Sequence, residues 1–551
     1  MANNFSAKIL GNAISSLNAQ QAVIANASNN IANVNTEGYT RRKVVLETRS
    51  DTTGSGLSLG NGVKVGDVQR VSDEFLENIL RDTIGEQSSA ETQSGFLDRV
   101  QALFSLSGNA KTIGTTMTDF FNSLEDLKTN PASIELRANV LERAEDLVQS
   151  IRDTFSSLAN LQSEADQRLQ NEVQTINSLT QQIANLNTLV ESRESSGVTA
   201  ADERDQRNRI LNQLAQKVSF SVVETSGGAI NVSLSNGFPL VTGATVRQLE
   251  TTANPSFGTA GPMLNGGALS SIVYDYDQTG AAPAHIDLTS ILANGEGTVG
   301  GLLEVRGTNA AGTPSPFAAT GDLVEVALEV EQVAVGFLLY FNEAYAGPDL
   351  VAAGTHQISS VDLDGNAITD PFAFFSATGL TDVVSGGADE GIASSQDIQN
   401  AYANGVPSLA SRITLAITDP RAIATRQNLA GNIGGTGDTR ILDLLTAVRT
   451  QSENFGNDSQ LPGVSTTSTR NLEEIYTGTV NIVGNKAARA AIDSSVSTDN
   501  LIAVQRRRDE ISAVSLDEEF SSLITFQRAF EASARMIRIA DEILQQVIQL
   551  I

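Results

Sequence analysis

The two ends of this 551-residue chain carry matching seven-residue patterns of apolar side chains. Each end has one row that repeats every seven positions and a second row three positions further on. The N-terminal rows include Leu10, Leu17, Ile24 and Ile31, then Ala27 and Val34. The C-terminal rows include Leu516, Leu523, Phe530, Ile537, Leu544 and Ile551, then Phe526, Ala540 and Val547. Sustained seven-residue spacing predicts a coiled-coil-like helix at each terminus.

The N-terminal helix has no charged residue between Ile9 and Thr36. Nearly half of this segment is Ser, Thr, Asn or Gln, so it cannot be a membrane span. Beside the apolar rows, Asn26, Asn30 and Asn33 form a stripe of amides. An amide can be buried by hydrogen bonding without the desolvation cost of an ion. We therefore expect this helix to be buried on two faces, against the C-terminal helix and against other subunits.

The C-terminal helix has a clear start signal. Ser515 and Glu518 lie three positions apart and predict a capping box. Asp517, Glu518 and Glu519 then fall in the first turn, where the helix dipole favours negative charge.

Composition excludes several classes of function. The chain has 36 Lys and Arg against 64 Asp and Glu, a formal net charge of −28. So acidic a chain disfavours nucleic-acid and anionic-membrane partners. It has no cysteine, so it forms neither disulfides nor thiolate metal sites. The first residues lack the pattern of a cleaved signal peptide, so we expect any export to use another route.

More helix is predicted inside the ends. One short helix runs through Met117 and Leu127 and stops at Asn130, and a second begins at Pro131. The second helix continues for most of sixty residues with a break. The three-four spacing from Leu323 to Tyr340 predicts a third.

From Val218 the apolar period changes to two, and Gly227-Gly228 predicts the turn of a hairpin. Gly-, Thr-, Ala- and Pro-rich stretches follow. We therefore predict an α+β multidomain fold, with a helical-bundle trunk and two β-rich inserts. The expected parts are 1–36 plus 515–551 as assembly domain, 37–217 plus 321–346 and 431–514 as trunk, and inserts at 218–320 and 347–430.

No motif supports catalysis. His285 and His356 lack nearby ligands at metal-binding spacing, and Asp362–Asn366 departs from a calcium loop. Gly431–Asp438 lacks the Lys-Ser/Thr of a phosphate loop, so Asp438 or Thr439 as a helix cap explains it better. Arg506–Arg508 read as a solvated or ion-paired helix face. We expect no catalytic, cofactor or metal site and no enzyme activity.

The two termini together resemble a known family. Ser28–Arg42, "SNNIANVNTEGYTRR", resembles the N-terminal motif of the axial proteins of the bacterial flagellum, namely rod, hook and hook-associated proteins. Val514–Ile551 is similar to their C-terminal motif. The Gly-Tyr-Thr-Arg form at Gly38–Arg41 is similar to the hook-associated protein 1 branch more than to hook protein. Interior stretches such as Phe120–Ala144 and Glu203–Glu224 agree.

The resemblance implies a structural junction between hook and filament. It implies an inner tube built from both termini, with a helical trunk around it and β domains outside. Implied partners are other copies of the chain in a tubular layer, the hook protein, hook-associated protein 3 and an export chaperone at the C-terminal region. It also implies secretion to the extracellular flagellum through the type III apparatus, without a cleaved signal peptide.

Three alternatives remain open from the sequence. The chain could be a self-polymerising hook or filament subunit, which would form long tubes alone. It could be a secreted adhesin or enzyme that acts through its middle region from Val218 to Gly431. It could also be a cytoplasmic coiled-coil dimer.

Overall fold

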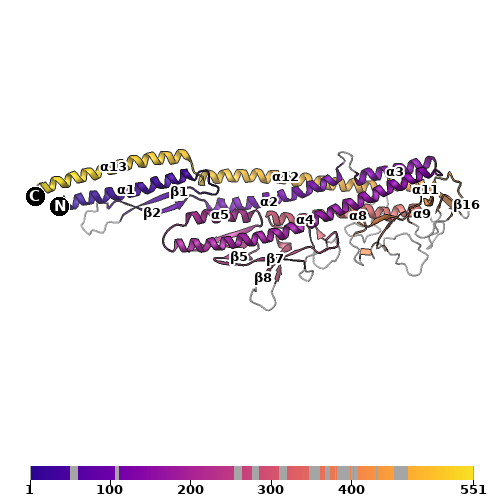
Figure 1. The fold of residues 1–551 in the computed structure, drawn as a ribbon, viewed down its shortest axis with the longest axis horizontal. Helices are drawn as coiled ribbons and strands as arrows, with labels where there is room; N and C mark the ends of the chain where they lie inside the picture. The colour runs from indigo at the N-terminus through magenta and orange to yellow at the C-terminus, as the bar shows by residue number, and fades with distance from the viewer. Residues whose placement is uncertain are drawn as a thin grey trace. The chain divides into compact units, whose positions relative to one another are not determined.

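The computed structural model describes most of the chain (Figure 1). The described residues are 2–49, 60–105, 111–253, 263–275, 285–309, 319–346, 360–366, 373–378, 380, 398, 401–402, 408–429, 432–451 and 470–549. The chain divides into two compact units. Unit 1 comprises Met1–Gln87, Thr175–Gln248 and Val496–Ile551; unit 2 comprises Ser88–Gln174 and Leu249–Ser495. Each unit combines segments from several of the four expected parts, and that four-part division stays a prediction.

Unit 1 contains both terminal helices. Helix α1 spans Ala2–Ala32 and α13 spans Leu516–Gln549, and they lie side by side (Figure 1). Helix α5 spans Ala201–Ala215. Three longer helices contribute residues to both units: α2 (Glu74–Phe104), α4 (Ile134–Glu194) and α12 (Leu472–Ser512). The predicted pairing of the terminal helices is confirmed, as is the predicted fold class of helices with small sheets in the middle region.

Two sheets complete unit 1. Strands β1 (Arg42–Thr48) and β2 (Val63–Arg70) form an antiparallel pair that we did not predict within the trunk. The predicted hairpin from Val218 is confirmed, with Val222 opposite Val232. It belongs to a four-stranded sheet of β3 (Phe220–Glu224), β4 (Ile230–Leu234), β5 (Pro239–Thr242) and β6 (Thr245–Val246).

Unit 2 combines helices with several small sheets. Its helices include α3 (Ile113–Thr129), α6 (Thr289–Leu292), α7 (Gly297–Arg306), α8 (Asp322–Gly336), α9 (Asn342–Ala346) and α11 (Arg440–Ala447). A π-helical turn, Phe337–Phe341, joins α8 to α9. The paired strands are β7 (Leu249–Thr252), β8 (Ser271–Asp275) and β9 (His285–Asp287); β10 (Thr308–Asn309) and β11 (Ala319–Thr320); β12 (Ser360–Val361), β15 (Arg426–Leu429) and β16 (Asn432–Ile433); and β13 (Phe375–Ala377) with β14 (Ile413–Leu415).

Helix α4 corrects two expectations. It begins at Ile134 and not at Pro131, because Ser133 Oγ accepts from the Leu136 N–H at 3.3 Å while Asn130 instead ends α3. It also runs for 61 residues without the break that we expected. No Gly or Pro interrupts its sequence, and its apolar residues keep helical spacing throughout.

The core of unit 2 is a cluster of phenylalanines. Phe120 of α3 lies with its ring centroid 5.4 Å from that of Phe341 and 5.8 Å from that of Phe375. All six rings of the cluster are buried, and they come from α3, the π-helical turn and the start of β13: Phe120, Phe121, Phe337, Phe341, Phe374 and Phe375.

Buried charged side chains attach the irregular segments of unit 2 to its helices. Asp166 of α4 pairs with Arg306 and accepts from the Ser270 N–H at 2.9 Å. Arg137 donates to the Ile423 carbonyl at 2.6 Å, and Glu331 accepts from the Ser408 hydroxyl at 2.7 Å. Burial raises the pKa of Glu331 and lowers that of Arg137. Because removing one member of such a pair strands a buried charge, these contacts fix where the segments lie.

Candidate assembly interface

The contact between α1 and α13 is built from small and polar side chains. Ser16 Oγ lies 3.1 Å from Ser533 Oγ, and Gln20 Nε2 donates to both, at 2.8 and 3.2 Å. Ala27 and Ala540 are also buried, and they lie seven positions after Gln20 and Ser533 on their helices. Small residues allow the two helices to approach closely, so this seam is narrow.

Most of the predicted interface residues are incompletely covered within the chain. Ala27, Asn30 and Ala540 are buried, whereas Val34 and Leu516 are exposed. The remainder are intermediate: Leu10, Leu17, Ile24, Asn26, Ile31, Asn33, Leu523, Phe526, Phe530 and Ile537. The side chains of Leu544 and Val547, and all of Ile551, lie outside the described residues. The assembly role of all these residues stays a prediction.

Helix α13 also exposes apolar side chains that the seven-residue rows do not contain. Phe520 is 52% exposed and Ile539 is 54% exposed. Ile524, Met536 and Ile543 behave similarly, as does Ile14 on α1. The sequence could have indicated this exposure, because α13 has more large apolar residues than contact with a single partner helix can cover.

The amide face of α1 lies against strands of the same chain. Asn26 Nδ2 donates to the Arg42 carbonyl at 2.8 Å, and Asn12 Nδ2 donates to the Gly60 carbonyl at 3.1 Å. The Ser15 hydroxyl accepts from the Val63 N–H at 3.3 Å. We expected this face to meet other subunits. The pair β1–β2, which we had not predicted, meets it instead.

A third face of α1 remains in contact with solvent. Its residues are exposed and uncharged, are small or polar except for Ile14, and follow three- and four-residue spacing: Gly11, Ile14, Asn18, Gln21, Ala25, Ser28 and Ala32. Together with the exposed apolar residues of α13, this uncharged stripe is the part of the terminal pair that can meet another molecule.

Asn30 fixes the chain as it leaves α1. This side chain is fully buried; its Nδ2 donates to the Arg42 carbonyl at 2.9 Å. Its Oδ1 accepts from the Tyr39 hydroxyl at 2.8 Å and from the Arg42 N–H at 3.2 Å. Burial raises the pKa of Tyr39, so this phenol stays a donor. Asn33, directly after α1, is different, because its Nδ2 donates at 2.9 Å to the carbonyl of Asn29 in the last turn of that helix.

Arg41 ties this turn to the joint between α12 and α13. Its backbone N–H donates to the Ser512 carbonyl at 2.9 Å. Its guanidinium pairs with Glu518 at 2.6 Å and Glu519 at 2.8 Å. The carboxylate of Glu518 is therefore engaged by Arg41. Ser515 directly precedes α13 and its carbonyl accepts from Glu519, while the predicted capping box stays a prediction.

Arg42 ties the same turn to α5. Its guanidinium donates to Asp202 at 2.5 Å and to Asp205 at 3.4 Å. The buried carboxylate of Asp205 also accepts from Arg70 Nε of β2 at 2.7 Å. Sequence reasoning missed these pairs. Arg41-Arg42 and the acidic start of α5 were visible, but no local pattern says which charges meet.

Gly38 allows the turn to form. Its φ of 75° lies in the left-handed region, and a side chain there would meet Arg209 Cδ at 2.3 Å. Both facts explain why glycine suits the position.

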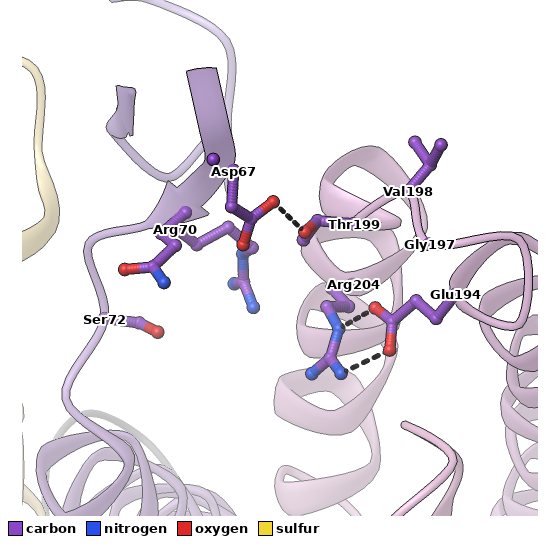
Figure 2. A pocket seen from close by; sticks show the side chains of 10 residues that line it. Asp67, Arg70, Ser72, Glu194, Gly197, Val198, Thr199 and Arg204 are labelled. Atoms are coloured by element: carbon purple, nitrogen blue, oxygen red, sulfur yellow. Dashed lines mark hydrogen bonds and ion pairs between the residues drawn. The ribbon is translucent and has the colours of Figure 1, made fainter. Parts of the chain in front are cut away.

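An open cavity of about 490 Å³ lies beside this network in unit 1, between β2 and the loop that joins α4 to α5 (Figure 2). Arg204 Nε donates to Glu194 at 2.6 Å, and the Thr199 hydroxyl donates to Asp67 at 2.6 Å. The acidic groups of its wall are therefore already engaged, and the lining has no pair of free carboxylates for acid–base chemistry.

The motifs that we had set aside have structural roles. Asp362–Asn366 forms a turn, in which the Asn366 N–H donates to Asp362 Oδ1 at 2.8 Å. Asp438 Oδ1 accepts from the Arg440 N–H at 3.2 Å just before α11, whereas Thr439, the N-cap residue, makes no side-chain cap hydrogen bond. His285 lies on β9, and His356 lies outside the described residues. In the described part of the chain, no group of three or more His, Cys, Asp and Glu could hold a metal ion, and no helix is long and apolar enough to cross a membrane.

Comparison with known proteins adds three family matches along the chain. Residues 97–355 match the flagellar hook-associated protein FlgK helical domain. Residues 500–550 match the flagellar basal body rod FlgEFG protein C-terminal family, and residues 10–40 match the flagella basal body rod protein family. The last two matches fall on α13 and α1.

Full-length relatives agree. The chain is 27% identical to flagellar hook-associated protein 1 of Escherichia coli K12, covering 98% of this chain and 99% of that protein. It is 25% identical to the protein of the same name from Bacillus subtilis 168, covering 97% and 96%. Among solved structures, the flagellar hook junction protein FlgK from Burkholderia pseudomallei matches with a TM-score of 0.58 and 17% identity, over 80% of this chain and all of that one. This likeness supports the fold.

Proposed function

This chain belongs to the flagellar hook-associated protein 1 family, and on that premise we propose how it joins hook to filament: through the incompletely covered pair α1–α13. It is a structural component of the flagellum and not an enzyme. The observation that carries the proposal is the exposure of large apolar residues along α13, beside an uncharged stripe on α1.

Energetics support assembly as the purpose of these helices. Ordering each residue of α1 and α13 costs about 1–2 kcal/mol in backbone entropy. The seam between them buries alanines and serines, whose small apolar area contributes little free energy to offset that cost. Covering each large apolar side chain of α13 would add roughly 1.5–3 kcal/mol. Neighbouring molecules in a tubular layer supply that cover.

The partners that fit this arrangement are other copies of the chain, the hook protein on one side and hook-associated protein 3 on the other. An export chaperone would cover the apolar residues of α13 before assembly. Export would proceed without a cleaved signal peptide to the extracellular flagellum, and the absence of cysteine suits a chain that travels unfolded.

Native-state hydrogen exchange tests the proposal directly. We expect α1 and α13 to exchange quickly in the dilute monomer and slowly once the protein is bound to isolated hooks. Slow exchange of both helices in the monomer would contradict it, because the pair would then need no further cover. Long tubes formed by the purified protein alone would favour a self-polymerising subunit instead.

Substitutions in the seam test the same idea. Ile24→Asp and Ile537→Asp should each abolish incorporation at hook ends while unit 2 stays folded, because a charge enters a face that must be buried. Ile24→Val and Ile537→Val are matched controls and should incorporate normally. Incorporation of either Asp variant at the wild-type level would refute the role of these rows.

A further inference from the structure

Phe75 is the most exposed large apolar side chain of the described residues, at 74%. It lies in the first turn of α2, and this turn is well fixed. Asp73 Oδ1 accepts from the N–H groups of Phe75 at 3.0 Å and Leu76 at 3.2 Å, and Leu76 and Glu77 are buried. A phenylalanine held into solvent by an ordered helix is typical of an interface anchor.

The surface around Phe75 is acidic. Glu74, Asp82 and Glu86 are exposed and follow helical spacing on the same side of α2. None of the three carboxylates forms a salt bridge within the part of the chain that the structure describes. We call Glu74, Phe75, Asp82 and Glu86 the acidic stripe.

The end of α12 offers the opposite chemistry. Ile502 is 40% exposed, and Arg506 and Arg507 are exposed one turn further on. Neither arginine forms a salt bridge with any described residue. Arg508, in contrast, already pairs with Glu77 at 3.3 Å and with Asp509 at 3.0 Å. We call Ile502, Arg506 and Arg507 the basic end.

The acidic stripe and the basic end do not meet within one chain. Helices α2 and α12 pack through other residues, with Leu80 and Ile84 of α2 in one cluster with Leu501 and Val504 of α12. The Glu77–Arg508 pair lies at this contact. Because the contact uses those faces, the stripe and the basic end remain available to another molecule.

We propose that the acidic stripe of one copy docks on the basic end of a second copy within the same layer. Each surface has an apolar centre beside unpaired charges, and the charges are opposite. A contact between two different surfaces of identical chains can repeat around a ring. This inference rests on the proposed assembly function, and it adds a lateral contact outside the terminal helices.

Charge reversal tests the pairing. Arg506→Glu with Arg507→Glu, or Glu74→Arg with Asp82→Arg, should each lower incorporation at isolated hooks at least about tenfold, because like charges then face each other. A chain with all four substitutions should recover incorporation. All four positions are exposed, but Glu74 and Asp82 lie close to the buried Arg81 of α2, so circular dichroism and thermal unfolding must show that each variant monomer is folded before its incorporation is compared.

Cross-linking identifies the partner. Because the chain has no cysteine, Asn78→Cys and Gln505→Cys can be placed on separate copies. A disulfide should form between them in assembled layers, and Val223→Cys with Gln505→Cys should give none. Wild-type incorporation by both reversals, or the absence of a disulfide between positions 78 and 505 in assembled layers, would overturn the inference. If Ile24→Asp still blocked incorporation in that case, the proposed function would stand without this contact.

Discussion

Unit 1 and unit 2 differ most in charge and in the cover of their apolar residues. Unit 1 carries 20 Lys and Arg against 24 Asp and Glu, a net charge of −4, whereas unit 2 carries 16 against 40, a net charge of −24. Among the described residues, unit 2 buries its phenylalanines and exposes five other large apolar side chains, whereas unit 1 exposes seventeen, Phe75 and Phe520 among them. The difference indicates that unit 1 offers more apolar surface for contacts with other molecules, while the strong negative charge of unit 2 makes copies of it repel one another.

The largest expected effect is in the core of unit 2. Phe120→Ala should reduce the free energy of unfolding by about 3–5 kcal/mol, because the ring contacts five other phenylalanines and its loss leaves a cavity. Denaturant unfolding of the monomer measures this loss.

The same substitution in unit 1 is the matched control. Phe520→Ala should change monomer stability by less than about 0.5 kcal/mol but weaken incorporation at hook ends. The comparison between the units fails if both substitutions cost the monomer equally.

A smaller effect is expected at a polar contact of unit 1. Asn30→Ala should cost about 1–3 kcal/mol, because the Arg42 N–H and the Tyr39 hydroxyl lose their acceptor. Hydrogen exchange at the Arg42 amide should quicken. Asn18→Ala, at an exposed position of the same helix, should leave that amide unchanged, and equal exchange in both variants would rule out this role of Asn30.

The smallest effect concerns Asp438, a carboxylate of unit 2 that forms an ion pair with Arg440. Arg440 holds the pKa of Asp438 at about 2, below its ordinary value of 3.8. A lowered pKa stabilises the fold above pH 3.8, and this contribution disappears as the pH falls towards about 2. Asp438→Asn should therefore remove part of the acid sensitivity of unit 2.

Urea midpoints measured from pH 5 to pH 2 on wild type and Asp438→Asn would show this. Parallel curves for the two proteins would mean that the ion pair of Asp438 does not contribute to stability. Asp438 would then behave like an acidic side chain that only contacts solvent.

The sequence predicted the elements whose signals are local. Seven-residue spacing located α1 and α13, and a change to period two at Val218 located β3 and β4. It did not predict β1–β2, although Val44–Leu46 form a short apolar run between charged residues and Val63 and Val65 flank Lys64. Because β1–β2 was not predicted, the amide face of α1 was wrongly expected to meet other subunits.

The interface could be predicted only in part for a physical reason. Rows of apolar residues show which side of a helix avoids water, but not how much of that side one partner covers. Phe520 and Ile539 lie off the rows, and the structure shows that packing against α1 leaves both exposed. Arg41 pairs with Glu518 of α13, 477 positions along the chain, and Arg42 pairs with Asp202 of α5, 160 positions along. No local sequence pattern encodes pairs at such separations.

The uncharged face of α1 has a consequence for where such a joint can work. Contacts between ions weaken as salt rises and change when carboxylates or imidazoles titrate. Gly11, Asn18, Gln21 and Ala25 have neither property. An attachment made through them should hold with nearly the same strength in dilute and in saline surroundings, and at acidic or alkaline pH. This part of the coupling, unlike a contact between charged surfaces, would need no adjustment between fresh water and brine.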